Sequence, residues 1–242
     1  MFKLLSTANP KIQKGTERGY LSFILHLAPS TLSGHNTCPK ATKGCTAACL
    51  NTAGRGGMFK RGETTNVIQK ARIRKTNYFY DDRAGFMFDL MQDIKKGIRL
   101  ANKLGLEPVF RLNGTSDLSW EKYSMIEGKN VFDVFAGIQF YDYTKDFSRM
   151  LKPQAPNYHL TYSVDERAVT KINAATALSS GLNVAMVFNV KDESELPAEY
   201  MGFPVINGDE HDLTFLHGNG VIVGLKAKGK AKKDNSGFVI QL

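Results

Sequence analysis

The segment LSFILHLA, residues 21–28, decides the fold class that we expect for this chain. It is apolar at nearly every position, so both faces of a strand built from it are suited to burial, and Pro29 ends it. A short run that is apolar on both faces is typical of a buried strand in a parallel sheet. Because ligands bind at the carboxyl ends of such strands in open α/β sheets and barrels, we expect a functional loop soon after residue 28.

Strand-like and helix-like segments alternate along the rest of the chain. Further runs of strand length occupy residues 108–114, 131–141, 157–163, 183–190, 203–208 and 220–227. Helical patterns occupy residues 60–82, 86–105, 143–151 and 165–181. Strands that alternate with helices predict βαβ units and a mainly parallel sheet, here with about seven strands. The polar residues before 21 are expected to form an arm or a first edge strand.

We therefore predict an α/β fold in a single domain that spans residues 1–242. The expected architecture is a partial or closed βα barrel, similar to a TIM barrel, and the alternative is a flavodoxin-like open sheet. The sequence has no GxGxxG motif after its first strand and no Walker A motif, which argues against the common nucleotide-binding folds. It also has neither a Ser-His-Asp signature nor an HExxH motif, so the usual hydrolase and metalloprotease sites are not expected.

The composition is that of an ordinary globular protein with an excess of positive charge. Hydrophobic residues make up 42% of the chain and charged residues 23%. No apolar run approaches the roughly 18 residues that span a membrane, and the first residues lack a signal-peptide core, so we expect a cytoplasmic protein without a membrane partner. The net charge of +9 favours a polyanionic partner, most simply single-stranded DNA or RNA.

The loop CPKATKGCTAACLNTAGRGG, residues 38–57, contains all three cysteines of the chain: Cys38, Cys45 and Cys49. Three thiols are poorly suited to a disulfide framework, because pairing two leaves the third over. They are well suited to a [4Fe-4S] cluster in which three irons are held by cysteine and the fourth iron is open. A zinc ion held by the three cysteines and one outside ligand, for which His35 is the nearest candidate, is one alternative, and three unrelated buried thiols are another.

Polar residues follow each predicted strand, as the mouth of a βα barrel requires. The segment RLNGTSD offers Asn113, Ser116 and Asp117 as cofactor-binding residues, and Asp209, Glu210 and His211 of the segment NGDEHD are expected to line the same pocket. Asp117 and these three residues are also the candidate catalytic groups, because carboxylates and histidine can act as acid and base. The alternative is that such residues serve only turns and helix caps.

Basic residues are concentrated in the predicted helix 60–82 and in the C-terminal segment 226–233. The candidate nucleic-acid contacts are Arg61, Lys70, Arg72, Arg74, Lys75, Lys228, Lys230 and Lys232. Lysine and arginine side chains bind phosphates, and the aromatic residues 78–80 that close the helix suit base stacking. The alternative is a solvated basic face whose aromatic residues belong to the core.

A strand, a loop with three cysteines and then repeating βα units resemble the layout of radical S-adenosylmethionine (SAM) enzymes. In that superfamily three cysteines after the first strand hold a [4Fe-4S] cluster whose open iron binds SAM. The cysteine spacing here is Cx6Cx3C, whereas CxxxCxxC is usual there. The resemblance implies a cluster at the mouth of a barrel, with SAM as a second cofactor that reduction cleaves to a radical.

Over most of its length the chain resembles the phage gene-product-88-like proteins. The segments that carry this resemblance are CPKATKGCTAACLNTAGRG, RLNGTSDLSWEK, QFYDYTK, YHLTYS, NGDEHD and VGLKAKGKAKKDNSGFV. The resemblance implies a phage protein that is present in the cytoplasm of an infected bacterium. It also suggests that the three cysteines, RLNGTSD and NGDEHD belong to one site.

Two functions are therefore expected. The first is an iron–sulfur protein, with or without radical-SAM-type catalysis, that acts on nucleic acid or a nucleotide. The second is a non-enzymatic iron–sulfur protein that binds single-stranded nucleic acid. A zinc-stabilised structural protein is a weaker third hypothesis.

Overall fold

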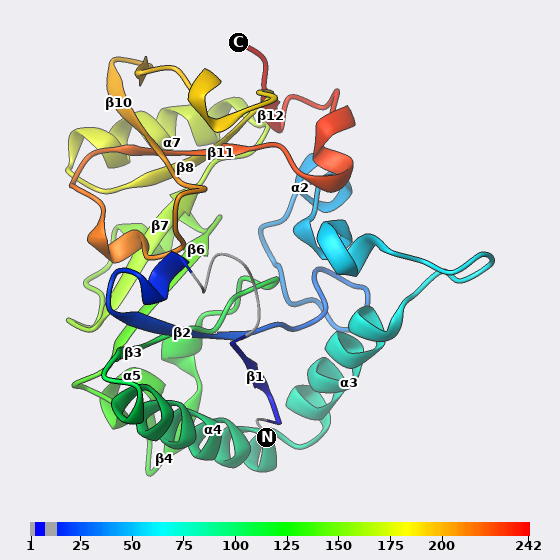
Figure 1. Ribbon diagram of the computed structural model, residues 1–242, viewed down its shortest axis with the longest axis vertical. Helices are drawn as coiled ribbons and strands as arrows, with labels where there is room; N and C mark the ends of the chain where they lie inside the picture. The colour runs from blue at the N-terminus through cyan, green and yellow to red at the C-terminus, as the bar shows by residue number, and fades with distance from the viewer. Residues whose placement is uncertain (1–2, 8–13) are drawn as a thin grey trace. The chain divides into compact units, whose positions relative to one another are not determined.

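A computed structural model describes residues 3–7 and 14–242 of the chain (Figure 1). The chain divides into two compact units. Unit 1 consists of Met1–Pro39, Val67–Asp142 and Gln154–His159, and unit 2 of Lys40–Asn66, Tyr143–Pro153 and Leu160–Leu242. Part of the arm that we expect before residue 21 lies outside the described residues. The expectation of a single domain stays a prediction.

Within the described residues, ten strands form a mostly parallel sheet in the order β1-β2-β3-β6-β7-β8-β11-β10-β9, with β12 beside β8. The strands are β1 Leu5–Ser6, β2 Tyr20–Leu25, β3 Glu107–Arg111, β6 Gln139–Thr144, β7 Tyr158–Ser163, β8 Val184–Phe188, β9 Glu199–Tyr200, β10 Phe203–Asn207, β11 Ile222–Lys226 and β12 Val239–Ile240. The α/β class with mainly parallel strands is confirmed. This strand order has two ends, so the described sheet is not a closed barrel; the partial barrel stays a prediction.

Two long helices cover part of unit 1. They are α3, Val67–Asp81, and α4, Arg83–Lys103. Asp82 begins α4 as its N-cap by accepting a hydrogen bond from the Gly85 amide, and apolar side chains at helical spacing form its buried face. A methyl group at Gly97 would lie 3.0 Å from Phe110, so the absence of a side chain there lets α4 lie close against β3. Helix α4 therefore buries one side of β3.

The other elements of unit 1 are short. They are the 3-10 turn η3 Trp120–Lys122, the hairpin strands β4 Ser124–Ile126 and β5 Lys129–Asn130, and helix α5 Val131–Val134. None of these elements carries a predicted site residue.

Unit 2 is built around the parallel pair β8 and β11, which runs in register from Val184 opposite Ile222 to Phe188 opposite Lys226. Its helices are α2 Lys43–Ala47, α6 Phe147–Met150 and α7 Ala168–Ser179. Its 3-10 turns are η1 Leu50–Thr52, η2 Gly54–Gly57, η4 Glu193–Glu195, η5 Thr214–Leu216 and η6 Gly229–Lys233. None of the helices in the described ranges combines the length and the apolar character that crossing a membrane requires.

The predicted strand over residues 131–141 is wrong in its first half. Residues Val131–Val134 form helix α5, because Asn130 and Asp133 form a reciprocal capping box that starts a helical turn. Strand β6 begins only at Gln139 and continues to Thr144, where a helix was expected. The helix predicted over 60–82 begins at Val67, after a segment of turns. The expected edge strand is confirmed for Leu5–Ser6, which pairs with β2 in antiparallel orientation.

A buried carboxylate holds this edge strand in place. Asp93 of α4 is 1% exposed, and its Oδ2 accepts hydrogen bonds from the amides of Leu4 at 2.7 Å and Leu5 at 3.3 Å. Lys75 of α3 donates to the carbonyl of Leu4 at 2.6 Å. Burial and the nearby charge of Arg72 lower the pKa of Lys75. Both long helices of unit 1 thus provide polar partners for the backbone of a strand that is only two residues long.

We expect Asp93→Ala to destabilise the protein by about 2–4 kcal/mol, because two buried amides would lose their acceptor. Asp93→Asn keeps an acceptor oxygen and should lose less. Asp81→Ala, at the exposed end of α3, is the control and should change stability by less than about 0.5 kcal/mol. Urea unfolding measures all three variants, and equal midpoints for Asp93→Ala and Asp81→Ala would contradict this account of β1.

Candidate functional site

The predicted cysteine loop crosses from unit 1 to unit 2. Cys38 lies in unit 1, and Cys45 and Cys49 lie in unit 2. All three are half-buried thiols outside any disulfide. In the described part of the chain no three His, Cys, Asp or Glu side chains are grouped as a metal site. A three-thiolate centre therefore stays a prediction.

Cys38 lies beside the predicted RLNGTSD segment, within unit 1. Its sulfur accepts a hydrogen bond from the Ser30 amide at 3.3 Å and lies 3.8 Å from the carbonyl oxygen of Thr115. The Asp117 amide donates to the carbonyl of Thr37 at 2.9 Å. Two of the segments that we expect to share a site are thus in contact.

Within RLNGTSD, Asn113 is buried and its side-chain amide is fully used. Its oxygen accepts from the Ser116 hydroxyl at 2.9 Å, the Leu118 amide at 3.0 Å and the Trp120 indole at 3.2 Å. Its nitrogen donates to the Leu118 carbonyl and to Asp142. Because an amide side chain has two donors and two acceptor lone pairs, Asn113 has no group left for a ligand in this arrangement. Asn113 and Ser116 therefore shape the loop, whereas Asp117 is partly exposed.

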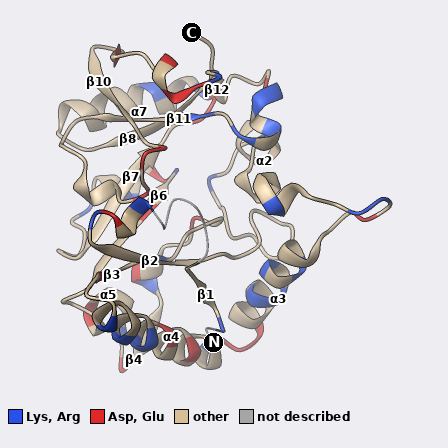
Figure 2. Ribbon diagram, in the orientation of Figure 1, with Lys and Arg blue, Asp and Glu red and all other residues tan. Residues whose placement is uncertain are grey.

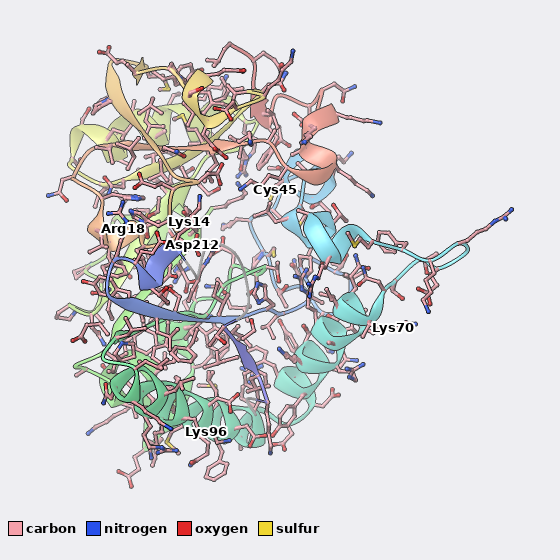
Figure 3. All side chains as sticks on the ribbon, viewed as in Figure 1. Lys14, Arg18, Cys45, Lys70, Lys96 and Asp212 are labelled. Atoms are coloured by element: carbon pink, nitrogen blue, oxygen red, sulfur yellow. The ribbon has the colours of Figure 1, made fainter. Side chains whose placement is uncertain are left out.

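Cys45 and Cys49 lie in a short segment of unit 2 that comprises α2 and η1. Thr42 is the N-cap of α2, and its Oγ1 accepts from the Cys45 amide at 3.1 Å. The Cys49 sulfur accepts from the Asn51 amide at 3.5 Å. Figure 3 labels Cys45 on this small helix. Backbone amides thus contact the thiol of Cys49 and hold the turn around Cys45.

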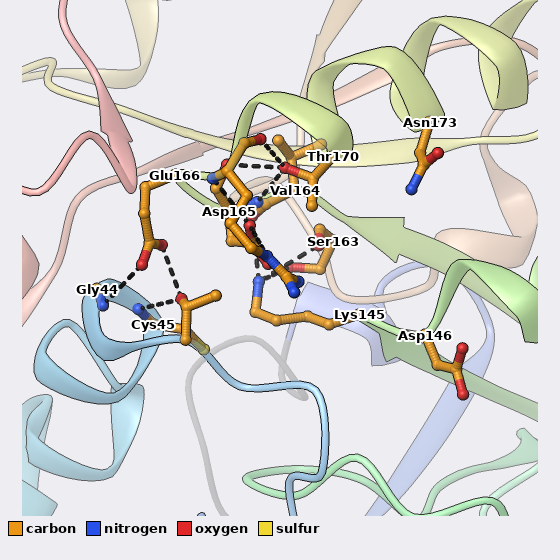
Figure 4. A network of polar contacts seen from close by, with 12 residues as sticks. Gly44, Cys45, Lys145, Asp146, Ser163, Val164, Asp165, Glu166, Thr170 and Asn173 are labelled. Atoms are coloured by element: carbon orange, nitrogen blue, oxygen red, sulfur yellow. Dashed lines mark hydrogen bonds and ion pairs between the residues drawn. The ribbon is translucent and has the colours of Figure 1, made fainter.

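The loop between β7 and α7 contacts this segment through Glu166. The Glu166 carboxylate accepts from the Thr42 hydroxyl at 2.7 Å and from the Gly44 amide at 3.0 Å (Figure 4). These two contacts join α2 to the carboxyl end of a parallel strand, where ligand sites of α/β proteins form. Nothing in the sequence marks Glu166, because the partner segment lies more than 100 residues away along the chain.

Two further charged groups lie at the same end of β6 and β7. Lys145 donates to the Ser163 hydroxyl at 3.1 Å and to the Val164 carbonyl at 3.1 Å (Figure 4). Asp165 is 2% exposed, and both of its oxygens accept from the Arg167 guanidinium, at 2.9 and 2.6 Å. Burial acts to raise the pKa of Asp165, but the hydrogen bonds from Arg167 and the charge of Lys145 outweigh it and lower that pKa.

The NGDEHD segment of unit 2 is mostly buried. Asp209 is 4% exposed, accepts from the Lys226 amide at 2.8 Å and pairs with the Lys228 ammonium. His211 is buried, its Nδ1 accepts from the Leu213 amide at 3.1 Å, and its ring centre lies 4.9 Å from that of His217. Glu210 is exposed. Of the three candidate catalytic groups in this segment, only Glu210 presents its side chain to solvent.

The predicted nucleic-acid contacts fall into three groups that differ in exposure and in protein partners. Arg61, Lys70, Arg74, Lys230 and Lys232 are exposed, and Figure 2 shows the positive charge of α3 and η6 in blue. Arg72 is partly buried. Lys75 and Lys228 have protein partners, the Leu4 carbonyl and Asp209 respectively. Lys75 and Lys228 are therefore poor candidates for phosphate contacts. The other residues of this set remain predicted nucleic-acid contacts.

Of the aromatic residues that close α3, Phe79 belongs to the packed interior of unit 1, whereas Tyr78 and Tyr80 are half-buried. Phe79 is fully buried against Trp120 and Phe86. The Tyr78 hydroxyl bonds to Asp89 at 3.0 Å, and burial and this bond raise the pKa of Tyr78 to about 12. Tyr80 stacks on His35 at 4.1 Å. The core alternative is therefore met by Phe79, and base stacking stays a prediction for the two tyrosines.

We expect Asp165→Asn to cost about 1–2 kcal/mol of stability at pH 7, because it removes a charge-assisted pair with the partly exposed Arg167. A carboxyl whose pKa is lowered by folding stabilises the protein above its unfolded pKa. That contribution disappears as the pH falls below about 4. The stability difference between wild type and Asp165→Asn, measured by urea unfolding, should therefore shrink between pH 7 and pH 3.

Arg167→Gln and the double variant complete a cycle that isolates the pair. A coupling energy that does not change between pH 7 and pH 3 would contradict this assignment.

The comparisons with known proteins bear on the whole chain. No curated protein and no solved structure shows significant similarity to it. A family model described as Gene product 88 matches residues 3–242. Since the match covers nearly every residue, the chain belongs to the Gene product 88 family.

Proposed function

We propose that this chain is a phage iron–sulfur protein in which Cys38, Cys45 and Cys49 hold a [4Fe-4S] cluster, and that it acts on nucleic acid or a nucleotide in the cytoplasm of the infected bacterium. The observation that carries the proposal is the presence of all three cysteines within residues 38–49 and none elsewhere. That segment is rich in threonine, lysine and glycine, which are loop residues. The partial, radical-SAM-like barrel is part of the same proposal.

The surroundings of the sulfur atoms support a cluster. The sulfurs of Cys38 and Cys49 each accept a backbone amide, from Ser30 and from Asn51. A thiolate is a better acceptor than a thiol, and amide hydrogen bonds to sulfur are among the factors that tune iron–sulfur centres. The donor set, three thiols on one short loop, fits a centre that keeps one iron open. When bound, such a cluster supplies single electrons.

Residues near the proposed cluster would position its loops and supply charged groups. Asp117 is partly exposed, and its amide holds the backbone next to Cys38 by bonding to Thr37. Glu210 is exposed and is the candidate acid or base of its segment. Asn113 would hold the loop around Asp117, and Ser116, whose hydroxyl donates to Asn113, remains a candidate cofactor-binding residue. Asp209 and His211 remain candidates that would need a rearrangement to contact a ligand.

Anaerobic purification with iron, sulfide and zinc analysis tests the cluster, and we expect about four iron and four sulfide per chain. Cys38→Ser, Cys45→Ser and Cys49→Ser should each lower both contents. A reduced-state EPR spectrum recorded with and without SAM tests the enzyme hypothesis: a change on adding SAM supports a radical mechanism, and an unchanged spectrum contradicts it. Zinc without sulfide would contradict every cluster hypothesis and favour the structural zinc protein.

A second candidate function, a non-enzymatic protein that binds single-stranded nucleic acid, has its own support in unit 2. Turn η6 presents Lys230, Lys232 and Lys233 to solvent, and none of them has a carboxylate partner in the described residues. A methyl group at Gly229 would lie 3.1 Å from the carbonyl of Thr52, so η6 lies close to η1, which follows Cys49. Unneutralised cations beside a cysteine segment suit a phosphate backbone.

The double variant Lys230→Ala/Lys232→Ala should weaken binding to a labelled single-stranded oligonucleotide and reduce the salt dependence of log K by about 1.4, since about 0.7 is lost per phosphate contact. Lys171→Ala/Lys191→Ala removes the same charge from exposed positions elsewhere in unit 2 and should change the slope much less. Fluorescence anisotropy at several salt concentrations measures both. Equal losses in the two variants would mean that net charge alone drives binding.

A further inference from the structure

We infer that Glu166 is a positioning residue for Cys45, acting through Thr42 and Gly44. Only the last measurement described below depends on the proposed cluster. The contacts that support the inference are those of the protein without metal. All of these residues belong to unit 2.

The contacts form a relay from the cysteine backbone to the carboxylate. The Cys45 amide donates to Thr42 Oγ1 at 3.1 Å, and the Thr42 hydroxyl donates its proton onward to Glu166 Oε2 at 2.7 Å. The other oxygen of Glu166 accepts the Gly44 amide at 3.0 Å. Because the Thr42 proton is committed to the carboxylate, the lone pairs of Oγ1 are oriented toward the Cys45 amide.

The space around Gly44 shows that the carboxylate is packed against the helix. Gly44 is buried, and a methyl group there would lie 2.7 Å from the carboxylate oxygen of Glu166 and within contact of the Ser236 hydroxyl. Two segments that are distant in sequence, the β7–α7 loop and the residues before β12, therefore meet at one backbone position. Only glycine leaves room for both.

Glu166 is itself held on both sides. Its neighbour Asp165 pairs with Arg167, and the Thr170 hydroxyl donates to the Asp165 carbonyl at 2.9 Å (Figure 4). The loop that carries Glu166 is thus fixed to α7. Helix α2 has only five residues, too few to be stable by its own hydrogen bonds. The β7–α7 loop therefore holds α2 in place, and Glu166 fixes the position of the Cys45 backbone.

Two measurements on the metal-free protein test this positioning. Glu166→Ala should increase the exchange rates of the Gly44 and Cys45 amides about tenfold, the effect of losing about one hydrogen bond. It should also raise the alkylation rate of Cys45 by iodoacetamide relative to that of Cys38, read by peptide mass spectrometry. Glu193→Ala, which removes a half-buried glutamate paired with Lys226, is the matched control and should change neither rate.

Conservative variants separate positioning from general destabilisation. Glu166→Gln can accept from Gly44 through its oxygen and donate to Thr42 through its nitrogen, so it should restore wild-type exchange and alkylation. Thr42→Ser keeps the relay and should behave as wild type, whereas Thr42→Val removes it and should behave as Glu166→Ala. Slow hydrogen exchange of the β8 amides shows whether each variant stays folded. If Glu166→Ala does not stay folded, the comparison of Thr42→Ser with Thr42→Val tests the inference.

Loading with iron and sulfide separates this inference from the proposed function. If wild type takes up no iron but Glu166→Ala still speeds exchange at Cys45, the cluster proposal fails and the positioning stands. If wild type loads a cluster and Glu166→Ala loads as much, with unchanged exchange, the positioning is overturned. Faster exchange in Glu166→Gln equal to that in Glu166→Ala would also overturn it, because the carboxylate charge and not the geometry would then be responsible.

Discussion

Parallel pairing of strands is the constraint on which the arrangement of polar groups in both units depends. A parallel neighbour can be reached only by a crossover that returns the chain to the starting edge, so successive strands end at the same edge of the sheet. In unit 1 this places Asn113, which follows β3, next to Asp142 of β6. In unit 2 it places Lys145, which follows β6, next to Ser163 at the end of β7, and Asp209 next to Lys228.

Most of the polar side chains at these edges hold loops. The Asn113 amide, the Asp209 carboxylate and the Glu166 carboxylate each accept hydrogen bonds from backbone amides, and two of the three are almost fully buried. A carboxylate or amide that is buried in this way needs its partners, since an unpaired polar group costs more than the bond contributes. Loops held so firmly can keep cysteine thiols in a defined arrangement, which is the property that a cluster of fixed geometry demands.

The lysines of the C-terminal segment are also divided between residues that pair with carboxylates and residues that face solvent. Lys228 and Lys226 leave the sheet close to acidic groups and pair with Asp209 and Glu193, whereas the lysines of η6 face solvent. A run of lysines that is uniform in sequence therefore separates into a structural part and a part that is available to phosphates. The paired lysines lie at the end of β11 or two residues beyond it, whereas the exposed lysines lie in η6.

The sequence by itself determined the fold class, most strands and helices, and the position of the cysteine loop after the first parallel strand. Apolar periodicity and turn residues are local signals, and they report the local state of the chain. They failed at residues 131–134, where the capping pair Asn130 and Asp133 starts a helix within an apolar run. Only the tertiary structure decided which polar residues hold loops and which remain exposed, and only it revealed Glu166, whose partners lie far away along the chain. The physical reason is that a hydrogen-bond partner brought close by folding leaves no trace in local sequence pattern.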